Sequence, residues 1–368
     1  MKNYDVIIVG GGIIGSSIAY ELAKRQKRVL VLERRRLASE ASGAAAGMLA
    51  AQVEMGLEVG PLFELALKSR KLYPQLAKEL RELSGIDIGL INRGMLKVAQ
   101  TAEEKNEYEN IIKVQRALGQ ELNWCPNIQD KEKSAAGLEA MEVPEDGQVD
   151  APSLSLAFAK SAQAHGAHIQ EYAEVQSLLL EENQIKGVQT LAGNFYSEHV
   201  IVAAGAWSEK LLKQTGLYMP TYPVKGECFS VIANEPLLKS TLFSHGCYIV
   251  PKKGNRLLIG ATAQPGTFDK RVSFKSIHAL MNKAKELLPE IETAEWEKAW
   301  AGIRPQTRDG LPYLGLHPQY KNLAIATGHY RNGILLSAVT GPLIADLIEG
   351  KNIDLAAFAV DRHGKDES

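Results

Sequence analysis

Cysteine is scarce in this sequence, with three residues, Cys125, Cys228 and Cys247, among 368. Their number is odd, their spacing is wide, and no Cys-x-x-Cys pair occurs. This pattern excludes a disulfide framework and argues against a zinc knuckle or other metal site. It fits a reducing cytosol, so we expect a cytoplasmic protein.

An excess of charge is also missing. The 42 Lys and Arg residues nearly balance the 43 Asp and Glu residues, which leaves a formal net charge of −1. Such a balance provides no basic footprint for nucleic acid and no polybasic segment for a membrane surface. Long hydrophobic runs are absent too, because three glycines interrupt the apolar stretch 6–15 and no other run approaches the ~20 residues of a membrane span. We therefore expect a soluble, unexported protein.

A glycine-rich loop is the first motif that is present. Residues 5–9 form a continuous apolar run, typical of a strand buried on both faces, and Gly10, Gly12 and Gly15 follow with the spacing G-x-G-x-x-G. Gly10 allows the tight turn, Gly12 lets a pyrophosphate approach the backbone, and Gly15 lets the following helix, which runs to about residue 25, pack on the strand. The pattern predicts a dinucleotide site at the N-terminus of that helix.

Glu33 ends a second predicted strand, over residues 28–32. An acid at this position accepts hydrogen bonds from ribose hydroxyls and disfavours a 2′-phosphate. The loop alone leaves FAD and NAD open. Residues 39–51, which are almost all small, follow directly and indicate a backbone that approaches something flat and large.

Further apolar segments predict the rest of an α/β fold. Strands are expected near 200–204 and 323–326, with a helix over 332–349. A helix is expected over 62–83, kinked by Pro74, with one apolar face formed by Leu65, Leu72, Leu76, Leu80 and Leu83. Short strands within 228–262 suit an antiparallel sheet.

Several segments together resemble the flavin-dependent amine oxidases, the group of D-amino acid oxidase, sarcosine oxidase and glycine oxidase, and most of all its bacterial glycine oxidase branch. They are the glycine loop with Glu33, SGAAAGML at 42–49, HVIVAAGAWS at 199–208, VKGEC at 224–228, CYIVP at 247–251, GIRPQTRDG at 302–310 and GHYRNGILL at 328–336. They span nearly the whole chain.

The resemblance implies a Rossmann-type FAD-binding domain and a second domain, built on a mixed or antiparallel sheet, that binds substrate. We expect the FAD-binding domain to be discontinuous, over 1–84, 151–220 and 300–368, and the substrate domain to comprise 85–150 and 221–299. The flavin is expected to be non-covalent, because no cysteine follows Cys247, in the region where similar sarcosine oxidases carry their attachment site.

The resemblance also implies the site residues. Arg304 would bind the substrate carboxylate with its planar guanidinium, Tyr248 would add a hydroxyl, and Arg331 would lie near substrate and flavin. The proposed chemistry needs no catalytic acid or base. His245 and His329 lie beside motif positions, where a place on a polar pocket rim is at least as well supported as a role as acid or base. The expected cofactor contacts are Gly10, Gly12, Ile13, Ile14, Gly15, Glu33, Arg34, Ser42, Ala46, Gly47, Met48, Val175, Ala204, Gly205, Trp207, Gly328, His329, Arg331, Asn332, Gly333, Ile334 and Leu335.

The activity so implied is oxidation of glycine and related small amines by hydride transfer to flavin N5, with hydrolysis of the imine and formation of hydrogen peroxide. It would feed the thiazole branch of thiamine biosynthesis, in a homotetramer. Ala263 stands where a bulkier residue such as Met is expected, so sarcosine or D-alanine stay open as substrates. The alternatives are a D-amino acid or sarcosine dehydrogenase that uses an electron carrier, and a non-catalytic flavin-holding subunit. An NAD-dependent enzyme ranks last.

Overall fold

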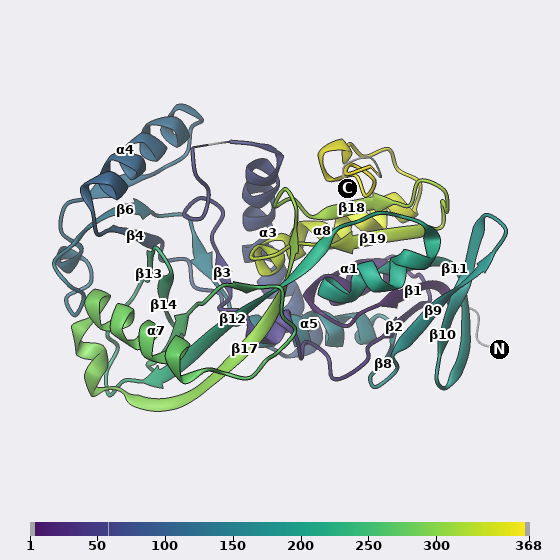
Figure 1. Ribbon diagram of the computed structural model, residues 1–368, viewed down its shortest axis with the longest axis horizontal. Coiled ribbons are helices and arrows are strands. Elements are labelled where there is room, and N and C mark those ends of the chain that lie inside the picture. Colours follow the sequence, from purple (N-terminus) through teal and green to yellow (C-terminus); the bar gives the residue numbers. More distant parts are fainter. Residues whose placement is uncertain (1–3, 58, 365–368) are drawn as a thin grey trace.

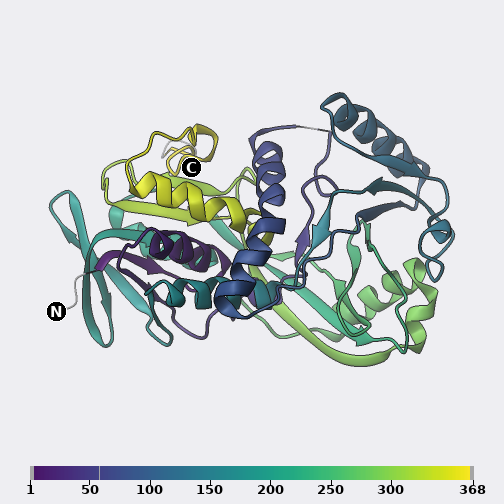
Figure 2. The same cartoon turned by 180° about the vertical axis from the view of Figure 1, so that it is seen from behind.

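The computed structural model describes residues 4–57 and 59–364, which form two large β-sheets with helices packed against them (Figure 1). One sheet lies in each half of the molecule. Figure 2 shows helix α3 (Pro61–Ser84) standing between the two halves. Among the described residues, no helix combines the length and the apolar character that a bilayer crossing requires.

The first sheet has eight strands, and its core is parallel, in the order β19-β11-β1-β2-β8. Strand β18 adds to β19 antiparallel, and β9 and β10 continue from β11 as antiparallel strands. Their bounds are β1 (Tyr4–Val9), β2 (Val29–Leu32), β8 (His168–Gln170), β9 (Val175–Glu181), β10 (Gln184–Thr190), β11 (Gly193–Val202), β18 (Tyr313–Leu316) and β19 (Leu323–Thr327).

Both faces of this sheet are buried, as the continuous apolar run at 5–9 predicts. Val6 and Ile8 belong to a core that also holds residues of α1 (Ile13–Lys24), α3, α5 (Ala151–Ala164) and α8 (Gly333–Ile348). Ile7 and Val9 point the other way, into a core shared with β9, β10 and α6 (Ser208–Leu212). The first sheet is therefore a three-layer arrangement whose parallel strands all point their carboxyl ends toward one edge.

The second sheet has nine strands in the order β16-β12-β15-β14-β13-β4-β6-β5, with β17 paired to β12. All pairs are antiparallel except β13 with β4. The bounds are β4 (Met95–Ala99), β5 (Asn123–Cys125), β6 (Glu139–Val143), β12 (Thr221–Ile232), β13 (Thr241–Ser244), β14 (Cys247–Pro251), β15 (Arg256–Gly260), β16 (Gln264–Pro265) and β17 (Glu295–Thr307).

One helix covers each face of the second sheet. Helix α7 (Phe274–Leu287) buries Ile277, Leu280 and Leu287 in a core with Leu96, whereas α4 (Ala102–Ala117) packs against Met95 on the opposite face. The short elements are α2 (Ala41–Ala44), β3 (Met48–Leu49) paired with β7 (Gly147–Gln148), and the 3₁₀ turns η1 (Ile128–Asp130), η2 (Gly205–Trp207), η3 (Lys213–Thr215), η4 (Pro289–Thr293) and η5 (Ala356–Phe358).

The predicted α/β fold class is confirmed, and the predicted helix over 62–83 corresponds to α3. Its predicted apolar face was partly wrong, because Leu72 and Leu83 are 41% and 38% exposed. The buried arc of α3 is centred on Tyr73 and Leu80, and each residue turns a helix by about 100°, so the two exposed leucines fall at the edge of that arc. The expected domain boundary at residue 300 falls inside β17, and the division at these limits stays a prediction.

Candidate active site

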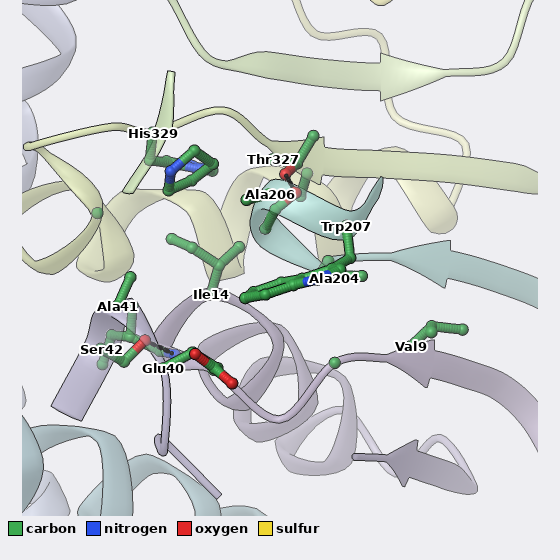
Figure 3. Close-up of a pocket in the computed structure, with 18 of the residues that line it drawn as sticks. Val9, Ile14, Glu40, Ala41, Ser42, Ala204, Ala206, Trp207, Thr327 and His329 are labelled. Carbon is green, nitrogen blue, oxygen red and sulfur yellow. Dashed lines mark hydrogen bonds between the residues drawn. The ribbon is translucent and has the colours of Figure 1, made fainter. Parts of the chain in front are cut away.

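The larger of two adjoining cavities opens at the carboxyl ends of the parallel strands. It has a volume of about 250 Å³ and is lined by the residues that end β1, β2, β11 and β19 or directly follow them. Ligands of open α/β sheets bind at this edge. Figure 3 shows His329 and Thr327 on one wall, Ser42 and Glu40 on the opposite wall, and the Trp207 indole between them.

The glycine loop forms the floor of this cavity. Gly10 has φ +110°, and a Cβ there would lie 2.5 Å from the carbonyl oxygen of Ala203, so only glycine fits. Gly12 caps α1 with extended backbone and no side-chain hydrogen bond, and the Ile13 N–H donates to the Ser42 Oγ at 2.9 Å. The positive end of the α1 dipole therefore faces the cavity, which suits a pyrophosphate.

Glu33 is fixed at one end of the cavity. It is 8% exposed, its Oε2 accepts from the Gly11 N–H at 2.8 Å, and its Oε1 accepts from the Arg35 N–H at 2.9 Å. The neighbouring Arg34 stacks its guanidinium on the Trp207 ring at 3.6 Å. An anchored acid in this place fits the ribose hydroxyls of an adenosine group.

The loop 328–332 forms the other end of the cavity and leads into α8. Gly328 has φ +78°, and the His329 Nε2 lies 3.3 Å from the Thr340 Oγ1. Burial lowers the pKa of His329 to about 3, so its imidazole is neutral at ordinary pH. The first residues of α8 line the cavity and add a second positive helix end.

A smaller cavity, of about 70 Å³, adjoins the first. Both are lined by Tyr330 and Arg331, so a ligand in one lies next to a ligand in the other. Its volume has room for roughly five to seven water-sized groups, the size of a small amino acid. The polar side chains that line it include Tyr248, Arg304 and Arg331, which the sequence assigned to substrate binding.

Arg331 is already paired inside this cavity. Its Nε and Nη2 donate to the two carboxylate oxygens of Glu54 at 2.8 and 2.9 Å. The Glu54 charge, first among several causes, raises the pKa of Arg331 further above its usual range. The sequence gives no sign of Glu54 as a site residue, because it lies 277 residues from its partner and belongs to no local motif.

Arg304 differs from Arg331, because no carboxylate pairs with it in the described part of the chain. Its Nη1 donates to the carbonyl of Thr262 at 3.1 Å. Its guanidinium lies on the backbone of Gly226, where a Cβ would come within 2.3 to 2.5 Å of three guanidinium atoms. A flat cation with unused donors at the wall of a small cavity is suited to bind a carboxylate.

Tyr248 is buried in the same cavity, with its hydroxyl 3.6 Å from the Cys228 Sγ. Burial raises the pKa of Tyr248 well above its usual value, so the hydroxyl stays protonated and can donate. Gly260 touches both groups, since a Cβ there would lie 2.5 Å from the Tyr248 hydroxyl and 2.7 Å from the Cys228 Sγ. Cys228 belongs to the segment VKGEC that the sequence singled out, but its place beside Tyr248 was not foreseen.

Most of the expected cofactor residues line the larger cavity: Gly10, Gly12, Ile13, Ile14, Glu33, Arg34, Ser42, Val175, Ala204, Gly205, Trp207, Gly328, His329, Arg331, Gly333 and Ile334. Ala46, Gly47 and Met48 line the smaller cavity instead.

Three expected cofactor residues line neither cavity: Gly15, Asn332 and Leu335. Gly15 has the packing role, because a Cβ there would lie 2.0 Å from the Gly10 carbonyl oxygen. Leu335 is buried in the core that α8 shares with α1, α3 and α5. Asn332 precedes α8, but its side chain does not cap the helix. His245 and Ala263 are exposed and line neither cavity, so the structure gives Ala263 no part in the size of the pocket.

The comparisons with known proteins agree with this geometry. A family profile described as "FAD dependent oxidoreductase" matches residues 5–347. The chain is 50% identical to a glycine oxidase of Geobacillus kaustophilus, over 98% of this chain and 97% of that protein. The crystal structure of glycine oxidase from Geobacillus kaustophilus superposes with a TM-score of 0.95, at 49% identity, and covers 99% of this chain and 100% of that one. A bifunctional protein ThiO/ThiG of Synechocystis is 35% identical over 97% of this chain and 54% of its own length.

Proposed function

The chain belongs to the FAD-dependent oxidoreductase family, and on that premise we propose that it oxidises glycine and related small amines, sarcosine and D-alanine among them. For glycine the overall reaction converts glycine, O₂ and water to glyoxylate, ammonia and hydrogen peroxide. The observation that carries the proposal is the small cavity in which Arg304, with no carboxylate partner among the described residues, lies beside the neutral Tyr248 hydroxyl.

The residues of the larger cavity fit FAD. Glu33 would hold the ribose, the N-terminus of α1 would face the pyrophosphate, and the loop 328–332 with the start of α8 would lie at the flavin. We propose that the FAD is held non-covalently, a proposal supported by the lack of cysteine among the described residues that line the larger cavity. Bound FAD supplies a two-electron acceptor for the hydride that leaves the substrate α-carbon.

The protein groups then bind and orient the substrate. Arg304 would take the carboxylate with charge-assisted hydrogen bonds, and Tyr248 would donate a further one. Glu54 neutralises Arg331. Among the described residues that line the cavity, Arg304 is then the one cation left for the single carboxylate of glycine. The lone pair of the neutral amine assists loss of hydride, and water completes hydrolysis of the imine, so no side chain has to act as base. Holding the α-carbon next to the larger cavity provides much of the rate enhancement.

The first test is spectroscopic. Glycine added to the purified holoprotein without oxygen is expected to bleach the visible flavin absorbance, and air is expected to restore it with formation of peroxide. Bleaching that air does not reverse would favour the dehydrogenase alternative. If the protein is yellow but glycine, sarcosine and D-alanine all fail to bleach it, the result would favour the alternative of a non-catalytic flavin-holding subunit.

The second test addresses the carboxylate assignment. Arg304→Ala removes at least one charge-assisted bond of ~1.5–3 kcal/mol, so the KM for glycine is expected to rise by tenfold or more while FAD stays bound. Arg93→Ala, at an exposed arginine outside both cavities, is the control and is expected to leave KM unchanged. An Arg304→Ala variant with the KM of the parent would remove the basis of the proposal.

The wider setting is proposed on resemblance. We propose that the oxidised product of glycine serves formation of the thiazole of thiamine, a role supported by the similarity to a ThiO/ThiG bifunctional protein. We also propose a cytoplasmic homotetramer. Light scattering of the purified protein tests the oligomeric state, and growth of a deletion strain with and without thiamine tests the pathway.

A further inference from the structure

The segment VKGEC contains a buried ion pair that the proposed reaction does not use. The Lys225 Nζ and the Glu227 Oε1 lie 3.1 Å apart, and the two side chains are 6% and 1% exposed. Neither residue lines either cavity. A buried ion pair gives little net stability over well-packed apolar side chains of the same volume, so stability alone does not account for it.

Both side chains hold the segment that joins β15 to α7, residues 261–273, which we call the connecting loop and which contains the two-residue strand β16. The Glu227 carboxylate accepts from the Ser273 N–H at 2.7 Å, at the end of the loop, and from the Thr262 hydroxyl at 3.5 Å, at its start. The Lys225 ammonium donates to the carbonyl of Arg271. One buried pair therefore fixes both ends of the connecting loop.

Thr262 is also bound by the backbone of Glu227. The Glu227 N–H donates to the Thr262 Oγ1 at 2.9 Å, and the Thr262 N–H donates to the Glu227 carbonyl at 3.2 Å. The carbonyl of Thr262 in turn accepts from the Arg304 Nη1 at 3.1 Å. Contacts thus run without a break from the buried carboxylate, through Thr262, to the guanidinium in the substrate cavity.

The strand geometry explains why Lys225 and Glu227 can serve Arg304 without lining its cavity. Alternate residues of a strand point to opposite faces. Gly226 presents its open face to the Arg304 guanidinium, so Lys225 and Glu227 point away from the cavity. In β17 the residue opposite Val224 is Arg304, one position from Lys225.

We propose that the Lys225–Glu227 pair positions the substrate-binding guanidinium by fixing the carbonyl of Thr262, to which Arg304 donates. The inference rests on the proposed function, because it takes Arg304 as the group that binds the substrate carboxylate. The pair contacts neither the substrate cavity nor the cofactor cavity, so it sets the affinity for the carboxylate and leaves the chemical step unchanged.

The test is a double-mutant cycle in the holoenzyme with Glu227→Gln and Arg304→Ala. The Kd of acetate, a carboxylate that is not oxidised, is measured by calorimetry, and KM and kcat are measured with glycine. Glu227→Gln is expected to raise the Kd of acetate and the KM for glycine at least fivefold, with kcat changed less than twofold. In the Arg304→Ala background it is expected to have no further effect on either constant.

Glu132→Gln is the matched control. Glu132 is 3% exposed, and its carboxylate accepts from the backbone N–H groups of Lys239 and Ser240 at 2.9 and 2.8 Å, but it lies outside both cavities. It therefore reports the general effect of weakening a buried carboxylate that holds a loop. The KM of this variant is expected to equal that of the parent.

A second pair of variants covers the case in which Glu227→Gln does not fold. Thr262→Val removes the hydroxyl that binds Glu227 and is expected to raise KM as Glu227→Gln does, whereas Thr262→Ser keeps the hydroxyl and is expected to restore KM. Equal effects of Glu227→Gln with and without Arg304 would overturn the positioning role while leaving the proposed function intact. An Arg304→Ala variant that binds acetate and glycine as the parent does would overturn both.

Discussion

Gly226→Ala is a substitution whose effect can be worked out from the structure in some detail. The new Cβ would lie 2.3, 2.4 and 2.5 Å from the Nη2, Cζ and Nη1 of Arg304, where about 3.4 Å is the closest ordinary contact. The guanidinium therefore has to move by about 1 Å. Because it is the far end of a flexible side chain, and because Gly226 does not have a positive φ, the backbone can keep its place.

The consequence is expected in substrate affinity and not in folding. A displacement of about 1 Å costs the guanidinium at least one of its charge-assisted hydrogen bonds to a carboxylate, worth ~1.5–3 kcal/mol. Since each 1.4 kcal/mol is about a factor of ten, the KM for glycine is expected to rise between about tenfold and about a hundredfold.

The assay is peroxide formation as a function of glycine concentration, together with the Kd of acetate and the melting temperature. Gly56→Ala is the control, because a Cβ at Gly56 meets no atom within 4 Å. If Gly226→Ala keeps the KM of the parent, the guanidinium of Arg304 is not the group that the substrate carboxylate contacts. If both variants melt at the temperature of the parent and only Gly226→Ala loses affinity, the reasoning is confirmed.

Three further predictions concern the cofactor cavity and its surroundings. Gly12→Asp places a favourable N-cap on α1 but puts a negative side chain where the pyrophosphate would lie, so the apoprotein is expected to stay folded, by circular dichroism, and to lose FAD binding. Gly60→Asp makes the same change at the N-cap of α3, outside both cavities, and is expected to keep FAD bound. The pKa of His329 is about 3 in the folded protein against ~6.5 in the unfolded protein, so the unfolded state binds more protons and the folded state loses stability as the pH falls below ~6.5. At pH 5 this loss is ~2 kcal/mol. Denaturant unfolding of His329→Gln is expected to show no such loss between neutral pH and pH 5. Glu54→Gln removes the one carboxylate among the described residues that line the smaller cavity. Without this negative charge, the Kd of acetate is expected to fall severalfold. An unchanged Kd would show that the Glu54 charge does not act on the substrate carboxylate.

The sequence by itself determined the parts of this protein that are built from neighbouring residues. The glycine loop, the strand before it and Glu33 at the end of the next strand lie within about thirty residues, the length of one βαβ unit, so their spacing could be interpreted without knowing the rest of the fold. Continuous apolar runs likewise indicated strands buried on both faces. The start of α8 after the loop 328–332 was equally clear from its helical spacing.

Only the tertiary structure decided how the substrate cavity is assembled. The pairing of β12 with β17 places Gly226 beneath Arg304 and brings Lys225 and Glu227 to the connecting loop, and a shift of one residue would have turned each of these side chains to the other face. The Glu54–Arg331 pair joins residues 277 positions apart, and Ala263 is exposed and does not line the cavity in which the sequence placed it. Such contacts depend on strand register and on loop paths between distant segments, and no local pattern of residues encodes either.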